Sequence, residues 1–345
     1  MNAAIIAGNT PERRVDALRQ FWEGNATDPL PLASFWLGLP KRGVRRRAYN
    51  AAGVLETLLL GRLGLFRPRL APGRHAGAPD VWALYDLEPL RRSLAEFVDF
   101  DRVNDGPVRV SFEATDVVTG ERVVFDSAER RIGPEHVLAS CALLPMFAPV
   151  EVEGRLLGDG CLSANTPLDL VLDEPASANL TCFVVDLFAQ KGSRPSGLLA
   201  SATRASDLAF ANQTRSILEG RKREYRMREL IHRLRERLPE DAQRDPEIAS
   251  ILAEARDGPQ VAYLRYRTSP EEPGLFKVFD FSRATLGDRW RAGADDMTCA
   301  LRAMQAPQDE PAQTGMSVRE IALDDGPPAT EESPGFSPPS LAPAA

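Results

Sequence analysis

The sequence predicts an α/β fold in which helices cover a layered sheet. Residues 180–188 form an almost unbroken apolar run, which is typical of a strand covered on both faces. Helical and strand patterns are interleaved along the chain, and this interleaving indicates an α/β arrangement. With 345 residues, the chain is long enough to bury a sizeable core.

Helices are expected along most of the chain. Pro11 and Pro134 each stand in the first turn of a predicted helix, where proline is favoured. The apolar spacing predicts helices at residues 1–8, 11–22, 87–97, 134–144, 208–238 and 284–304. Residues 55–65 are apolar but contain Gly61 and Gly64, so they predict a loose helix or a lid-like segment.

Short strands are predicted between these helices. Residues 108–112 alternate between polar and apolar, and the dipeptide Thr119-Gly120 turns the chain into residues 122–125, which predicts a β-hairpin. A second pair of short strands is expected on either side of Gly154, at residues 150–152 and 155–157.

Composition and charge argue against several classes of protein. The net charge of −7 argues against general nucleic-acid binding. No stretch approaches the roughly 18 consecutive apolar residues of a membrane-spanning helix. The first residues lack the features of a secretory signal, so a cytoplasmic location is expected. Beyond residue 305 the chain is rich in Pro, Ala, Glu and Ser, and this tail is expected to be disordered.

The four cysteines show no CxxC spacing. Cys141, Cys161, Cys182 and Cys299 stand among apolar or small residues, so they are expected to be reduced and buried. A zinc site or a disulfide framework is therefore not predicted. No cofactor is expected either.

One segment combines several features that suit a catalytic site. Asp159 stands between Gly158 and Gly160 directly after a predicted strand, and the glycines leave space around the carboxylate and permit a sharp turn. Asn165 and Pro167 then predict a turn in which the Asn side chain binds nearby backbone. Taken alone, an aspartate followed by glycine most often makes a turn, so the combination carries the argument.

This combination resembles the patatin-like phospholipase family. The family has a small-residue helix that ends in Pro, a pair of hydrophobic strands, then Asp-Gly and Asn-x-Pro. Here the corresponding residues are Ala139 to Pro145, Asp159-Gly160-Cys161 and Asn165-Thr166-Pro167. Cys161 departs from the usual smaller third residue, although Cys is small enough to fit.

Both ends of the chain add to the resemblance. Residues 1–8 are similar to the helix that follows the nucleophile elbow in the family, and residues 11–22 to the next helix. Residues 279–286 resemble a C-terminal extension of a bacterial subgroup. The resemblance extends from Met1 to Met304 and is strongest over residues 137–168.

The resemblance implies a three-layer fold with a central, mostly parallel sheet and a helical C-terminal extension. It implies a lipid acyl hydrolase that acts on phospholipids or other esters through a Ser-Asp dyad, without a catalytic histidine, cofactor or metal. Asp159 would activate the serine nucleophile. The expected domains are a catalytic domain at residues 1–190, a helical extension at 191–304 and a disordered tail at 305–345.

The serine of this dyad is missing from the sequence. No Gly-x-Ser-x-Gly occurs in it, and neither does the glycine-rich loop that supplies oxyanion-hole amides in the family. The first strands and the elbow would precede Met1, so the chain is interpreted as truncated, inactive and poorly soluble. The alternative is a catalytically dead relative that serves as a binding or regulatory module.

Other polar residues have simpler interpretations. Ser140, Ser163 and His136 are each expected to be structural. Residues 221–237 form a basic helical segment that could dock on anionic lipid headgroups, as a protein peripheral to a membrane would. The preferred interpretation is a solvated helix in which a narrow apolar stripe faces the core. The residues of this stripe are Met227, Leu230, Ile231 and Leu234.

Overall fold

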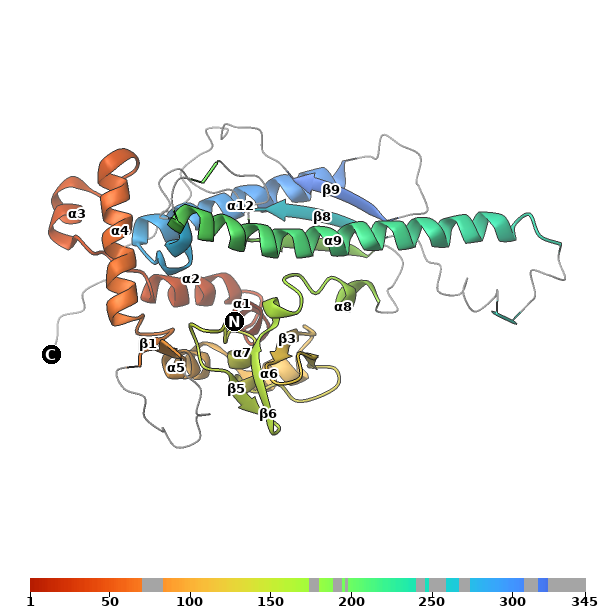
Figure 1. Ribbon diagram of the computed structural model, residues 1–345, viewed down its shortest axis with the longest axis horizontal. Helices are drawn as coiled ribbons and strands as arrows, with labels where there is room; N and C mark the ends of the chain where they lie inside the picture. The colour runs from red at the N-terminus through yellow and green to blue at the C-terminus, as the bar shows by residue number, and fades with distance from the viewer. Residues whose placement is uncertain are drawn as a thin grey trace. The chain divides into compact units, whose positions relative to one another are not determined.

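The computed structural model of the chain describes residues 1–69, 83–173, 180–188, 194–195, 198–239, 246–247, 259–266, 274–306 and 316–321 (Figure 1). The chain divides into two compact units, which are described separately. The first contains residues Met1–Ala164 and Ser269–Arg291, and the second contains Asn165–Thr268 and Ala292–Thr330. This division does not follow the expected boundary at residue 190, and the assignment of residues 1–190 as the catalytic domain stays a prediction.

The first unit begins with helices. They are α1 (Asn2–Ala7), α2 (Arg14–Gly24), α3 (Pro31–Leu37), α4 (Gly43–Leu60), α5 (Glu88–Phe97), α6 (Phe100–Asp105) and α7 (Pro134–Ala139). The helices predicted at residues 1–8, 11–22 and 87–97 are confirmed with small shifts. The loose segment predicted at residues 55–65 is instead, as far as Leu60, the end of the regular helix α4. The helix predicted at residues 134–144 ends already at Ala139.

A four-stranded antiparallel sheet follows in the same unit. Its strands are β3 (Ser111–Asp116), β4 (Arg122–Asp126), β5 (Val150–Val152) and β6 (Arg155–Asp159), in the order β4-β3-β6-β5. Both predicted hairpins are present, with Gly120 (φ 76°) and Gly154 (φ 75°) in their turns, although β3 begins at Ser111 and not at residue 108 as expected. The sheet that carries Asp159 is therefore antiparallel, whereas a mostly parallel sheet was expected. The strands β3 and β4 are joined by a tight turn, as are β5 and β6. Because a tight turn reverses the chain direction, each of these pairs must be antiparallel.

The core of this unit is completed where the segment around Phe66 meets the segment that contains Phe279 and Phe281. The strands β1 (Arg67–Pro68) and β2 (Tyr85–Asp86) pair with each other. Beside them, Phe66 lies edge to face with Phe279 and Phe281, with 6.1 Å between ring centroids in each case. Phe279 ends the 3₁₀ helix η2 (Gly274–Phe279), so the C-terminal segment fills part of the N-terminal core.

The second unit contains a parallel sheet between two long helices. The strands β7 (Thr181–Asp186), β8 (Gln260–Arg265) and β9 (Ser317–Ile321) lie in the order β7-β8-β9. Side chains alternate along β8, so Val261 and Tyr263 pack with α9 (Leu198–Arg235), and Ala262 and Leu264 pack with α12 (Arg283–Gln305). This helix–sheet–helix layering confirms the predicted α/β class. The short helix α8 (Asp169–Leu172) joins the face that α9 covers.

The strands of this unit correct two expectations. β9 lies in the part of the chain that was expected to be a disordered tail, and residues 307–315 and 322–345 lie outside the described residues. The C-terminal extension also contains β8, so it is not purely helical. The run at residues 180–188 is covered on both faces at Phe183 and Val184, but Val185 is exposed because β7 is an edge strand.

The long basic helix is confirmed as α9, but the expected burial of its apolar stripe is wrong. Met227, Leu230, Ile231 and Leu234 are 37–63% exposed. The contacts that hold α9 in its unit come from earlier turns, where Leu218 and Tyr225 pack on the sheet. Periodicity identified the apolar face of the helix, but it could not show where along its length the sheet ends.

Candidate active site

Asp159 is held at the end of a central strand. It is the last residue of β6, and its side chain caps the 3₁₀ turn η1 (Gly160–Leu162) by accepting a hydrogen bond from the Cys161 N–H at 2.9 Å. Its own N–H donates to the Ala142 carbonyl at 3.0 Å. The residue remains partly exposed. The Asp159 carboxylate is thus held in a fixed position at the end of β6 but is still reachable from outside.

Close packing requires a glycine at position 160 and leaves little room beside Gly158. A Cβ at Gly160 would lie 2.5 Å from the carbonyl oxygen of Glu113 on β3, and a Cβ at Gly158 would lie 3.3 Å from the carbonyl oxygen of Ala142. Neither glycine has a positive φ. The expectation that positions without a Cβ are needed beside Asp159 agrees with the close contact at Gly160, whereas the expected glycine-dependent turn is not observed here. The small residue Ala142 permits the same close approach from the other side.

The surroundings of Asp159 shift its acidity. Burial raises the pKa of the Asp159 carboxyl above its ordinary value of 3.8. Hydrogen bonds from the N–H and thiol of Cys161 act in the opposite direction, as does the positive amino group of Met1. The start of α1 is thus within electrostatic reach of Asp159.

Cys161 fits the position where the family usually has a smaller residue. Its thiol is a hydrogen-bond partner of the Asp159 carboxylate, and its pKa is raised by burial and by the negative charge of that carboxylate. A thiol with a raised pKa stays protonated at neutral pH and is a poor nucleophile. The raised pKa therefore disfavours Cys161 as a substitute for the serine.

Two hydroxyl groups near Asp159 were not identified as neighbours from the sequence. Thr115 on β3 donates to the Asp159 carbonyl at 3.2 Å, and the Oγ atoms of Thr115 and Ser163 are 2.7 Å apart. Thr115 is 44 residues away in the chain, and only the β3–β6 register brings it here. Ser163 is structural, as predicted.

Asn165 and Pro167 lie beyond the boundary between the two compact units. The Asn165 side chain donates to the Thr214 hydroxyl on α9 at 3.1 Å, and its N–H donates to the Gln213 side chain at 3.1 Å. The expected bond from this side chain to nearby backbone is replaced by a bond to α9. Asn165 thus anchors its turn to a helix of its own unit.

The remaining candidate residues have local structural roles. The Ser140 hydroxyl donates to the Val137 carbonyl at 2.8 Å, as predicted for a serine at a helix end. Nδ1 of the buried His136 accepts a hydrogen bond from the Gly133 N–H at 2.8 Å and so caps the start of α7. All four cysteines are free, but only Cys182 is buried and the others are half-buried. No group of three or more metal-ligating side chains occurs within the described part of the chain.

Two family models match the chain. One, described as patatin-like phospholipase, matches residues 1–172, and one described as patatin phospholipase matches residues 208–313. No match was found among the curated proteins. The chain belongs to the patatin-like phospholipase family, and its first match includes Asp159 with both flanking glycines. The membership supports a lipid hydrolase with lipid or ester substrates.

Proposed function

We propose that Asp159 is the carboxylate of a Ser-Asp dyad in a lipid acyl hydrolase. The observation that carries the proposal is the position of Asp159, which is fixed by backbone contacts, partly exposed and close to Met1, the residue that precedes α1. In the resemblance described above, the nucleophile elbow leads directly into the helix that corresponds to α1. A serine at that elbow would stand near Asp159.

In the proposed reaction, the serine hydroxyl attacks the ester carbonyl of a lipid while Asp159 accepts its proton. The alkoxy group leaves with a proton, an acyl-enzyme remains, and water then hydrolyses it to a free fatty acid. The raised pKa of Asp159 favours this role, because a base works best when its pKa is close to the operating pH. Substrates of this class form aggregates, so peripheral contact with a lipid surface is part of the proposal.

We further propose that the serine lies outside these 345 residues, because no Gly-x-Ser-x-Gly occurs within them. Ser140 and Ser163 are poor substitutes, since the Ser140 hydroxyl donates to the Val137 carbonyl and the Ser163 hydroxyl is hydrogen-bonded to Thr115. The chain as given is therefore expected to be inactive, and an active form would need a preceding segment that provides the elbow and the oxyanion-hole amides.

The first test compares the intact mass of the native protein with that of residues 1–345, and measures hydrolysis of a long-chain ester by both. The native-length chain should be heavier and active, and Asp159→Asn should lower its kcat by about 10⁴-fold. Asp101→Asn is the matched control, because Asp101 is an exposed aspartate paired with Arg131.

Three outcomes would count against the proposal in different ways. Hydrolysis by residues 1–345 that depends on Asp159 would contradict the missing serine. A longer, active chain that tolerates Asp159→Asn would contradict the dyad. A native chain of these 345 residues without activity would favour the alternative, a binding or regulatory module.

A further inference from the structure

The helix α3 exposes its apolar side chains instead of burying them. The helix has the sequence PLASFWL and contains no charged residue, and none of its residues is buried. Phe35 is 79% exposed and Trp36 is 78% exposed, and their rings pack edge to face on each other at 5.3 Å. Other strongly exposed apolar side chains around them are Leu32, Leu37 and Val44. A large apolar patch on a protein surface usually marks an interaction site.

This patch is next to a cluster of positive charge. Between Asp28 and Glu56 the sequence contains no acidic residue. The basic residues in this stretch are Lys41, Arg42, Arg45, Arg46 and Arg47. Lys41, Arg42 and Arg47 are exposed at the start of α4, which lies beside α3 in Figure 1. This charge contrasts with the net charge of −7 for the whole chain. The local surface therefore complements an anionic partner, although the whole chain does not.

The apolar helix is held in its exposed position by polar contacts at its two ends. At the start, the Asp28 carboxylate accepts hydrogen bonds from the Ser34 hydroxyl at 2.8 Å and from the Leu30 N–H at 3.3 Å. At the end, Arg45 donates to the Gly38 carbonyl at 2.6 Å. Because the helix is already ordered, docking does not have to supply the entropy of ordering it.

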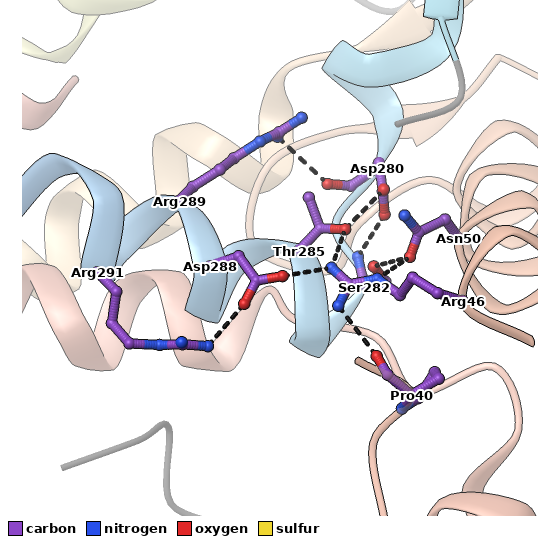
Figure 2. A network of polar contacts seen from close by, with 9 residues as sticks. All are labelled: Pro40, Arg46, Asn50, Asp280, Ser282, Thr285, Asp288, Arg289 and Arg291. Atoms are coloured by element: carbon purple, nitrogen blue, oxygen red, sulfur yellow. Dashed lines mark hydrogen bonds and ion pairs between the residues drawn. The ribbon is translucent and has the colours of Figure 1, made fainter. Parts of the chain in front are cut away.

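A buried polar network fixes the base of α4 and the loop before it (Figure 2). Arg46 is only 5% exposed and donates to the Pro40 carbonyl at 3.0 Å and to the Asn50 side chain at 2.9 Å. It also contacts the Thr285 hydroxyl at 3.1 Å and the Asp288 carboxylate at 2.9 Å, both on α12. The loop that carries Lys41 and Arg42 is thus anchored to the body of its unit.

We propose that α3 and the start of α4 form a docking surface for an anionic lipid bilayer. Phe35, Trp36 and the neighbouring leucines would insert at the level of the lipid headgroups, where aromatic side chains are favoured. Lys41, Arg42 and Arg47 would contact the lipid phosphates. The inference rests on the proposed lipid substrate only for the choice of a bilayer as the partner, and its test does not depend on hydrolysis.

The basic helix α9 fits a bilayer less well, although its apolar stripe is also exposed. Three of its arginines are engaged in ion pairs within their own unit: Arg221 with Asp173, Arg228 with Glu224 and Arg233 with Glu229. Its exposed stripe also contains no aromatic residue. Both differences favour α3 and the start of α4 as the surface that meets the lipid.

The test measures flotation of the 345-residue chain with two kinds of vesicle, phosphatidylcholine alone and phosphatidylcholine mixed with phosphatidylglycerol. Binding to the mixed vesicles should be stronger and should weaken as salt is raised. The triple variant Lys41→Gln, Arg42→Gln, Arg47→Gln should lower the partition coefficient by about 100-fold at low salt. The double variant Phe35→Ser, Trp36→Ser should lower it by at least about tenfold.

A matched control removes three charges from α9 by Arg215→Gln, Arg223→Gln and Arg226→Gln, and should leave binding almost unchanged. Quenching of Trp36 fluorescence by brominated lipid, with Trp36→Phe as the blank, reports insertion directly. All substituted side chains are exposed, so thermal melting should be unaffected.

Several results would overturn the proposal. One is no binding of the unaltered chain to the mixed vesicles, and another is equal binding by the α3 and α4 variants. A loss of binding confined to the α9 variant would assign the contact to that helix. Self-association without lipid that Phe35→Ser, Trp36→Ser abolishes would show that the patch is an interface between copies of this chain.

Discussion

Gly160 illustrates how one missing side chain permits the geometry of the candidate site. The backbone of η1 passes so close to β3 that only a hydrogen fits at this position, and Asp159 is held directly before it. The aspartate is therefore positioned by backbone packing on both sides, as well as by its own hydrogen bond to Cys161.

Gly160→Ala should destabilise the first unit by about 1–3 kcal/mol, because the new Cβ would be 2.5 Å from the Glu113 carbonyl oxygen and the backbone would have to shift. Gly220→Ala is the control, since that helical glycine has open space around it and alanine is favoured in helices by up to about 1 kcal/mol. Urea denaturation of both variants measures the change. Equal stability of Gly160→Ala and the unaltered chain would contradict the packing argument.

Asp159→Asn should change how stability depends on pH. Since burial raises the pKa of Asp159, the folded chain holds a proton that the unfolded chain has released, and stability falls as pH rises above about 4. Asparagine cannot titrate and can still accept a hydrogen bond from the Cys161 N–H. Its gain in melting temperature over the unaltered chain should therefore be larger at pH 7 than at pH 4. A constant difference would show that the carboxyl is not desolvated.

Among the elements, the loop before α4 and the start of α12 depend on one buried guanidinium. Arg46 connects the Pro40 carbonyl, Asn50 and two side chains of α12. Asp280 completes the network by accepting hydrogen bonds from the Ser282 N–H at 3.0 Å and the Thr285 hydroxyl at 2.8 Å. The motif at residues 279–286 that resembles a bacterial extension thus has a structural explanation within the first unit.

Arg46→Met should lower the free energy of unfolding by about 2–4 kcal/mol, because several buried acceptors would lose their donor at once. Arg47→Met removes the same charge from an exposed position on the same helix and should have little effect. Chemical denaturation followed by circular dichroism would measure both. If Arg46→Met were as mild as Arg47→Met, the network would not be what anchors the loop.

On the scale of the whole molecule, each compact unit is built from segments that are far apart in the sequence. The first unit needs Phe279 and Phe281 to complete its aromatic core, and the second needs β9 to pair with β8. Within the described residues, no helix is both long enough and apolar enough to cross a bilayer.

A chain that ends at Ala306 should melt at a lower temperature and aggregate more than a chain that ends at Asp325. Without β9, the central strand β8 becomes an edge with unpaired backbone groups and exposed apolar side chains. Differential scanning fluorimetry and light scattering would compare the two truncations. Identical behaviour would show that β9 contributes nothing to the stability of the parallel sheet.

The sequence alone predicted the local elements well. Periodicity located α5, α9 and α12 and both hairpins, because helix and strand patterns depend on nearby residues. Asp159 was identified by its glycines and by the family resemblance, and its surroundings agree with close packing there. Its role as the base of a dyad stays a prediction, as does the position of the missing serine.

Tertiary structure decided what lies opposite each local element. The antiparallel pairing of β3 with β6, the contact of Thr115 with Asp159 and the strand β9 all join residues far apart in the sequence. The same holds for the exposure of α3, whose apolar composition predicts burial when it is considered alone. A local pattern shows that a face is apolar, but long-range packing determines whether that face is covered by the rest of the chain.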